Sequence, residues 1–324
     1  MLASTILSQL TPASQTTGTE VRINPFKITD IPAAMERLSW TQSARLMRKW
    51  FSNPPYELPK TVKMGDVAAS TLKPEQLLTD LPFDWLFSAS GRIKPIIDAQ
   101  VENLAVVNEF NGTVGRQKAV LDQLSNGLIM LMTRIARLNL LDGPRGTLKD
   151  CYLDFSHYSA MQLEEASQFN FFKIGASTWE KASDELDDVY GALGSFAMKI
   201  AATKFRTVSN DRGFAAIGID EIGLYVRDTY DFVNVGSDQL LGYWSDERVI
   251  RPGPIDYFAQ PNFIDRGDRR HFKVTNNSFN DYRAKHGKGG DFLVFSTVKH
   301  YPVSIVVHLS STDFAEYHSR APRP

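Results

Sequence analysis

Residues 223–232 read Gly-Leu-Tyr-Val-Arg-Asp-Thr-Tyr-Asp-Phe, and they predict a β-strand that is apolar on one face. Successive side chains of a strand point to opposite faces, so every second residue shares a face if the strand continues unbroken. Asp228 falls on the otherwise apolar face, between Val226 and Tyr230. A buried carboxylate is costly unless it is hydrogen-bonded, ion-paired or bound to a metal. Asp228 therefore marks either a functional site or a strand end, where an aspartate caps a turn.

Further strand patterns surround this stretch. Apolar residues alternate with other residues from about position 196 onward. The alternating positions are Phe196, Met198, Ile200, Ile217 and Ile219. Two β-rich runs, 292–298 and 303–309, flank residues 299–302 and predict a hairpin there. We therefore expect the C-terminal half to be β-rich and mainly antiparallel.

The N-terminal half carries helical patterns instead. Asp30-Ile31-Pro32 has the cap and the first-turn proline of a helix start. Between residues 117 and 140, leucines and isoleucines recur at alternating spacings of three and four, as in an amphipathic helix. Burial of this stripe against helices of the same chain is the favoured interpretation, and a partner-binding face is the alternative. Arg134 and Arg137 lie off the stripe, so we expect them to be solvated.

Helical patterns in one half and strand patterns in the other are typical of an α+β fold. The expected organisation is a flexible leader over residues 1–24, a helical region over 25–145 and a β-rich region over 146–324. The β-rich region is expected to hold the active site. An acidic run, Asp184 to Asp188, lies within a predicted amphipathic helix over residues 179–193. We expect that run to be a solvated helix face rather than a cation site.

The composition excludes several classes of protein. The chain has 324 residues and a formal net charge of −1, and its basic residues are interleaved with acids, so we expect no nucleic-acid partner. A single cysteine, Cys151, cannot form a disulfide within the chain. No apolar run has the length of a membrane span, and residues 1–20 lack the basic and apolar regions of a secretory signal. We expect synthesis in the cytoplasm and, if the protein is exported, a route that reads the folded chain.

A second polar cluster, residues 282–292, precedes a predicted strand. It contains Arg283, His286 and Lys288 together with several glycines. Such a loop offers backbone N–H groups and positive charge to a phosphate, whereas a tight loop that enters a strand is the simpler interpretation. Its spacing is not that of a Walker loop or a dinucleotide fingerprint. A third polar group, around Arg270, is explained by a salt-bridged surface loop.

Four segments of the chain resemble a proteobacterial family that is known only as a domain of unknown function. The segments are residues 30–35, 44–51, 186–190 and 282–295. Members of that family tend to occur beside type VI secretion genes. The resemblance implies a role in interbacterial antagonism, with a secretion spike or adaptor protein as carrier and a cognate immunity protein as a further partner. It implies no particular chemistry.

Residues 228–232, Asp-Thr-Tyr-Asp-Phe, are similar to the Asp-x-Tyr-Asp-Phe signature of colicin M-like bacteriocins. Those enzymes hydrolyse lipid II, the lipid-linked peptidoglycan precursor, and need Mg²⁺. The resemblance implies that Asp228, Tyr230 and Asp231 are active-site residues. In that pattern Asp228 and Asp231 would bind Mg²⁺ or activate water, and Tyr230 would orient the substrate.

The chain departs from the colicin M-like pattern just after the signature. Those enzymes carry a His-Arg pair there, whereas residues 233–239 read Val-Asn-Val-Gly-Ser-Asp-Gln. If the chemistry is shared, other residues must supply these roles, and we expect His286 with Arg283 or Lys288 to stabilise the developing phosphate charge. The second choice is Arg270 with His271.

These features together predict an antibacterial type VI secretion effector. Such a toxin would hydrolyse a phosphoester or pyrophosphate bond of lipid II in the periplasm of the target cell, with its helical region docked on the carrier. A non-enzymatic secretion adaptor or spike-associated protein is the first alternative, in which the polar clusters lie far apart and merely close loops. A metal-dependent nuclease toxin is the second alternative, because such enzymes also use aspartate and histidine.

Overall fold

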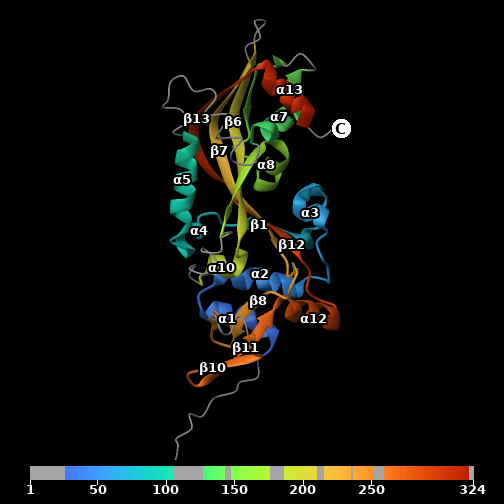
Figure 1. Cartoon of the computed structure of the whole chain (residues 1–324), viewed down its shortest axis with the longest axis vertical. Helices are drawn as coiled ribbons and strands as arrows, with labels where there is room; N and C mark the ends of the chain where they lie inside the picture. The colour runs from blue at the N-terminus through green and yellow to red at the C-terminus, as the bar shows by residue number, and fades with distance from the viewer. Residues whose placement is uncertain are drawn as a thin grey trace, which may run out of the picture.

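A computed structural model shows an elongated molecule with a large sheet in its upper part and a smaller sheet at its lower end (Figure 1). Helices prevail in the N-terminal half and antiparallel strands in the C-terminal half, so the predicted α+β class is confirmed. The structure describes residues 26–105, 127–142, 147–175, 186–209, 215–234, 236–251 and 259–320. The predicted leader, residues 1–24, lies outside these ranges.

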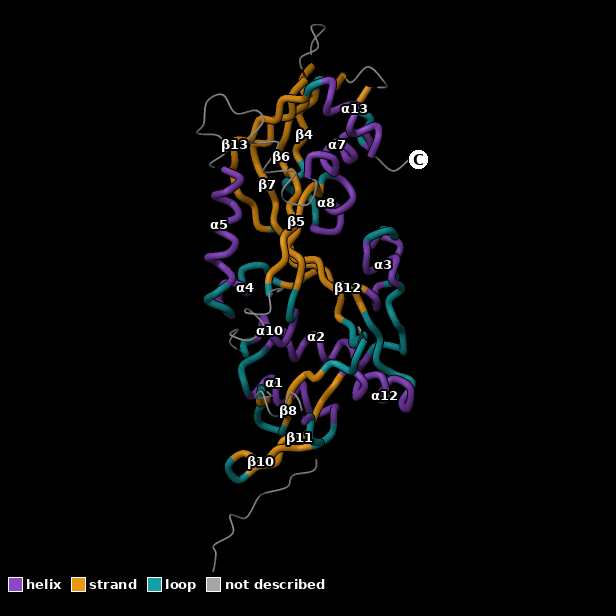
Figure 2. The backbone as a smooth tube through the Cα atoms, viewed as in Figure 1, coloured by secondary structure: helices purple, strands orange, loops and turns teal. Residues whose placement is uncertain are grey.

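The large sheet has seven strands and is built around two long ones, β6 (Phe196–Ser209) and β7 (Ala215–Tyr230), which pair antiparallel. The alternation of Phe196, Met198 and Ile200 that predicted β6 is confirmed, because all three side chains are buried. The other five strands are β1 (Leu77–Leu81), β4 (Cys151–Asp154), β5 (Gln168–Ile174), β12 (Phe292–Ser296) and β13 (Lys299–Leu309). Figure 2 shows how this sheet narrows toward the middle of the molecule, where β7, β12 and β1 continue downward.

The hairpin predicted at residues 299–302 is wrong, because these residues are the first part of β13 itself. β12 and β13 both pair antiparallel with β7, one after the other along the same edge. β12 lies opposite residues 227–230 and β13 lies opposite residues 215–224. Residues 299–302 pair with residues 221–224 of β7, so they are extended where a turn was expected.

Helices cover both sides of the upper sheet (Figure 1). α5 (Ile93–Ala105) packs against β13 on one side. On the other side lie α7 (Gly127–Arg137), α8 (Ala160–Ala166) and α13 (Ser311–Arg320). No helix among the described residues is both long enough and apolar enough to cross a lipid bilayer.

α7 is the described part of the helix predicted over residues 117–140. The stripe residues Leu128, Leu131 and Ile135 are buried within the chain, so the prediction of internal packing is confirmed for them. Arg137 is exposed as predicted, but the prediction for Arg134 is wrong. The Arg134 Nε donates to the Gln168 carbonyl at 3.1 Å, because β5 passes directly beneath the helix and offers a free acceptor.

The lower part of the molecule combines the first helices with the four-stranded small sheet. The helices there are α1 (Ile31–Arg37), α2 (Thr41–Ser52), α10 (Asp188–Leu193) and α12 (Asn276–His286). The strands are β8 (Leu240–Trp244), β9 (Val249–Ile250), β10 (Phe263–Arg266) and β11 (Arg269–Thr275). The short elements elsewhere are α3 (Lys60–Met64), α4 (Trp85–Ala89), β2 (Leu141–Asp142), β3 (Thr147–Leu148) and the 3₁₀ turns Ile28–Asp30, Ala69–Thr71 and Pro74–Gln76.

Asp188, the last residue of the acidic run, is buried, so the prediction of a solvated face is wrong for it. Its carboxylate accepts hydrogen bonds from the backbone N–H groups of Gln42 and Ser43, at 3.0 and 2.8 Å. These groups belong to the first turn of α2, where helical N–H groups have no partner within the helix. Trp85 Nε1 donates to the same carboxylate at 2.9 Å. Asp184 and Glu185 lie outside the described residues.

The helices of the first half and the strands of the second half share one hydrophobic core. Trp50 of α2 is fully buried, and its ring centroid lies 5.0 Å from that of Phe232 and 5.4 Å from that of Phe279. β1 pairs in parallel with β12. Residues from both of the predicted regions, 25–145 and 146–324, therefore meet at the lower end of β7.

Candidate functional site

The last residues of β7 line a cavity of about 240 Å³ in the lower part of the molecule. Its walls come from α1, α2, α10, β7, β8, β9, the end of β11 and α12, and most of its lining side chains are apolar or aromatic. These include Met35, Trp40, Met47, Leu193, Trp244 and Phe279. Asp228 and Asp231 are the charged residues among those that line the cavity.

Strand geometry places Asp228 at this cavity. Val226, Asp228 and Tyr230 alternate along β7 and so share a face, and Asp228 lies opposite Val294 of β12 in the register. The Tyr230 hydroxyl reaches Met47 Sδ of α2 at 3.6 Å, which shows that this face is directed toward α2. Burial also raises the pKa of the Tyr230 phenol, so the hydroxyl keeps its proton.

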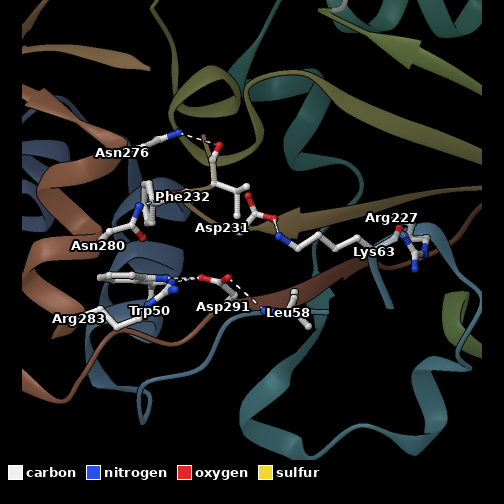
Figure 3. A network of polar contacts seen from close by, with 11 residues as sticks. Trp50, Leu58, Lys63, Arg227, Asp231, Phe232, Asn276, Asn280, Arg283 and Asp291 are labelled. Carbon is white, nitrogen blue, oxygen red and sulfur yellow. Dashed lines mark hydrogen bonds and ion pairs between the residues drawn. The ribbon is translucent and has the colours of Figure 1, made fainter. Parts of the chain in front are cut away.

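Two asparagines of α12 hold the chain where it leaves β7. Asn280 Nδ2 donates to the Phe232 carbonyl and Asn276 Nδ2 to the Val233 carbonyl, both at 3.0 Å (Figure 3). Backbone carbonyls that follow a strand have lost their ladder partners, so side-chain donors satisfy them here. These contacts fix the wall of the cavity next to Asp228.

The Asp228 carboxyl group is half-buried, and no ion pair reaches it within the described part of the chain. Burial raises the pKa of this carboxyl to about 8, and the negative charge of Asp231 adds to the rise. A hydrogen bond from the Thr229 N–H and the charge of Arg227 oppose it. Asp228 is therefore protonated at neutral pH. Ionisable groups that are perturbed in this way gather at functional sites.

Asp231 has a different environment although it lies only three residues further on. Its Oδ2 accepts from Lys63 Nζ of α3 at 2.8 Å, and the two side chains are 18% and 21% exposed (Figure 3). Lys63 in turn lies next to Arg227, whose Nη1 donates to the Lys63 carbonyl at 2.9 Å. Asp231 is thus ion-paired and Asp228 is not.

The resemblance to colicin M-like enzymes implies that Mg²⁺ is held by Asp228 and Asp231. Magnesium demands near-octahedral oxygen ligands, so several carboxylates, carbonyls or waters must converge on one point. Asp231 is engaged by Lys63, and the described residues contain no group of three or more His, Cys, Asp or Glu side chains that could hold a metal ion. The Mg²⁺ site thus stays a prediction of the resemblance, and no step proposed below passes through the ion.

The glycines of the loop before β12 do not form an open cradle for phosphate. The backbone N–H groups of Gly289 and Gly290 donate to the carbonyls of Asn53 and Trp50, at 3.0 and 3.1 Å. These carbonyls lie at the C-terminal end of α2, where helical carbonyls lack partners within the helix. A Cβ atom on Gly289 would lie 2.5 Å from the Trp50 ring. The loop is a tight connection into β12, which was the simpler of the two interpretations.

Arg283 points into the molecule and pairs with Asp291 (Figure 3). Its Nε also donates to the Gly289 carbonyl at 2.7 Å. Asp291 is fully buried and accepts two further hydrogen bonds, from Trp50 Nε1 at 3.1 Å and from the Leu58 N–H at 3.3 Å. Burial raises the pKa of Asp291, while Trp50 and Arg283 oppose that rise. Arg283 therefore pairs with a structural carboxylate and does not line the cavity.

His286 and Lys288 are exposed at and just beyond the C-terminal end of α12, and neither lines the cavity. The His286 ring lies over Tyr282, with ring centroids 4.6 Å apart. The structure thus does not bring Arg283, His286 and Lys288 together with Asp228 at the cavity, as the sequence led us to expect. The reason is that α12 turns Arg283 inward to Asp291 and ends at the surface.

The second-choice pair, Arg270 and His271, is divided by the alternation of β11. Arg270 Nε pairs with Asp265 at 2.9 Å on the exposed face. His271 is fully buried, and its Nε2 accepts from Arg248 Nε at 3.3 Å. Burial and the charge of Arg248 lower the pKa of His271. Neither residue lines the cavity.

Residues 26–309 match a family described as a family of unknown function, DUF6402. The chain belongs to this family. No curated protein and no solved structure matches the chain. The family assignment carries no chemistry, so the links to type VI secretion and to colicin M-like enzymes stay predictions.

The cavity of this DUF6402 protein also depends on residues that the sequence did not single out as site residues. Met47, Trp244 and Lys63 come from α2, β8 and α3, which are far from the signature in the chain. No spacing in the sequence links them to Asp228. A protonated carboxyl in an apolar cavity can donate a proton to a bound group or, once ionised, accept one. That is the chemistry that this arrangement offers.

Proposed function

We propose that this protein is an enzyme in which Asp228 transfers a proton to a substrate bound in the cavity. The observation that carries the proposal is the Asp228 carboxyl itself, which lines an apolar cavity without an ion pair in the described structure. The buried acids Asp188 and Asp291, in contrast, are each held by several donors. An acid without such partners lowers stability, so a role in function is the physical reason to keep it.

The reaction that we propose is hydrolysis of a phosphoester or pyrophosphate bond in lipid II, as the colicin M-like signature implies. Water adds to phosphorus, and Asp228 donates its proton to the oxygen of the departing group. The proton that water loses then restores Asp228, so the step balances without a further reactant. The mainly apolar side chains that line the cavity with Asp228 suit a substrate in which a hydrocarbon part adjoins a polar leaving group.

The biological setting of this proposal rests on the family resemblance alone. The protein would be made in the cytoplasm, delivered on a type VI secretion spike or adaptor, and act in the periplasm of the target cell. A cognate immunity protein would protect the producing cell.

The test is to express the chain in a test bacterium with and without a periplasmic signal. We expect lysis only with the signal, and we expect Asp228→Asn to abolish it. The matched control is Asp281→Asn, an exposed acid of α12, which should lyse cells as the parent does. Thermal unfolding of each purified variant checks that the protein is folded.

Each outcome of this experiment decides between functions. An Asp228→Asn variant as toxic as the parent would contradict the proposal. Toxicity confined to the cytoplasmic form, with loss of DNA or RNA, would favour a nuclease. A folded parent that is inert in both compartments would favour a secretion adaptor.

A further inference from the structure

The face of β7 opposite to Asp228 carries a second group of polar side chains. Its members come from α7, α8, β6 and β7, and we call it the cation cluster. They are Arg134, Glu164, Lys199, Tyr225 and Arg227. This group lies on the side of the large sheet that α7 and α8 cover, whereas α5 lies on the other side (Figure 1).

The strand register explains why these side chains meet. Lys199 of β6 lies directly opposite Tyr225 of β7, so the two side chains share a face. Arg227 is two residues further along the same face of β7. Glu164 reaches this face from α8, and its Oε1 lies 2.6 Å from Arg227 Nε.

Arg227 is fixed by its surroundings. Its side chain is 8% exposed, and besides Glu164 it contacts two backbone carbonyls of α3. Nη1 donates to the Lys63 carbonyl at 2.9 Å, and Nη2 donates to the Val62 carbonyl at 2.8 Å. Two hydrogen bonds from its Nη atoms and an ion pair with Glu164 therefore hold the positive charge of Arg227 in place.

The charges of the cation cluster do not balance. It contains three basic side chains, Arg134, Lys199 and Arg227, and one acid, Glu164. Burial lowers the pKa of Lys199 to about 8, and Arg227 and Arg134 lower it further against the attraction of Glu164. Like charges that crowd in a partly buried place repel one another, so an additional negative charge would relieve the strain.

A fully buried hydroxyl points to the same conclusion. Tyr225 has no exposed surface, and its hydroxyl oxygen has no hydrogen-bond partner among the residues that the structure describes. Tyr225 lies directly opposite Lys199 and shares its face of β7 with Arg227, so it belongs to the cation cluster. Buried hydroxyl groups nearly always have a partner, so an unpartnered one beside excess positive charge indicates a missing acceptor.

We propose that the cation cluster binds a small oxyanion, either a phosphate or a carboxylate, free or as part of a larger ligand. Lys199 and Arg134 supply the attracting charge, and the Tyr225 hydroxyl donates a hydrogen bond. Arg227 is held in place by Glu164 and adds to the positive field. The site is on the opposite face of β7 from the cavity, so it does not depend on the enzymatic role of Asp228.

The test compares the thermal unfolding of the protein in sodium phosphate, sodium acetate and sodium chloride at equal ionic strength. We expect phosphate or acetate to raise the melting temperature above its value in chloride, and the effective anion identifies the ligand class. Lys199→Gln should remove this difference. The matched control is Lys94→Gln, an exposed lysine of α5, which should keep the difference.

A second variant covers the case in which Lys199→Gln fails to fold. Tyr225→Phe removes only a hydroxyl that has no partner, so the fold should tolerate it. We expect its affinity for the stabilising anion, measured by calorimetry, to fall about five-fold or more because one hydrogen bond to a charged group is lost. Equal melting temperatures in all three salts, or unchanged anion affinity in Tyr225→Phe, would overturn the proposal.

Discussion

Two buried carboxylates on neighbouring strands occupy opposite environments. Asp291, just before β12, accepts from Trp50, from the Leu58 N–H and from Arg283, and these contacts join α2 and α12 to the sheet. Asp228, on β7, lines an apolar cavity and has no ion pair within the described chain. The comparison teaches that burial alone does not mark a functional acid. The absence of an ion pair among the described residues distinguishes Asp228 from an acid that holds the fold together.

The largest loss of stability is expected when Asp291, the ion-paired acid, is replaced. Asp291→Ala leaves Arg283 and Trp50 Nε1 without their buried acceptor, and breaking a buried pair costs about 3–5 kcal/mol. Urea unfolding at pH 7 should show this loss in the free energy of unfolding. Asp281→Ala, an exposed acid of α12, should stay within about 0.5 kcal/mol of the parent. A loss below about 1 kcal/mol for Asp291→Ala would show that its contacts are not structural.

The loop that leads into Asp291 should be the next most sensitive. A Cβ atom at Gly290 would clash with the Pro54 carbonyl oxygen, which is backbone and cannot easily move. We expect Gly290→Ala to destabilise the protein by about 2–3 kcal/mol in the same assay. Gly91→Ala is the control, because nothing lies within 4 Å of a Cβ there. Equal stabilities for the two variants would mean that the loop does not depend on close packing against α2.

The contribution of Asp228 to the stability of the fold should depend on pH in the opposite sense to that of a salt-bridged carboxylate. The folded pKa of Asp228, about 8, lies above the unfolded value of about 3.9, so its favourable contribution is complete below pH 4 and is lost as pH rises to 8. Asp228→Asn has no such titration. We therefore expect the stability of the variant to gain on that of the parent by roughly 1.4 kcal/mol for each pH unit between pH 5 and 8. Parallel stability profiles of the two proteins between pH 5 and 9 would contradict this.

The smallest effect is expected at the exposed end of α12. His286→Ala and Lys288→Ala remove side chains that do not line the cavity, so stability should change by less than about 0.5 kcal/mol. Lysis by the periplasmic form should also be unchanged. A loss of lysis in His286→Ala, with the fold intact, would show that His286 takes part in the reaction.

The sequence predicts the local parts of this structure and misses the distant ones. Alternation along β7 predicted that Asp228 lies on an apolar face, and the three-and-four spacing favoured packing of α7 inside the chain, which the structure confirms. These patterns depend only on neighbouring residues. They can therefore be recognised without knowing which elements pack against each other in the fold.

The errors arise where a partner comes from far along the chain. The turn expected at residues 299–302 is replaced by pairing with β7, and Asp188, expected to be solvated, accepts hydrogen bonds from the first turn of α2. The expected grouping of His286 with Asp228 is wrong. Arg283 of α12 pairs with Asp291 instead, and His286 lies at the exposed end of that helix, away from the cavity. No periodicity in a single sequence reports such contacts, which also explains why Lys63 beside Asp231 was not foreseen.

The most direct test of the account is a titration of the Asp228 carboxyl itself. Carboxyl ¹³C NMR shifts of the purified protein would be followed from pH 4 to 10, with the Asp228→Asn spectrum to assign the resonance. The account predicts that the signal missing from the variant titrates with a pKa of about 8. If that signal titrates near the ordinary aspartate value of about 4, Asp228 is a solvated surface acid and the proposed role in proton transfer is wrong.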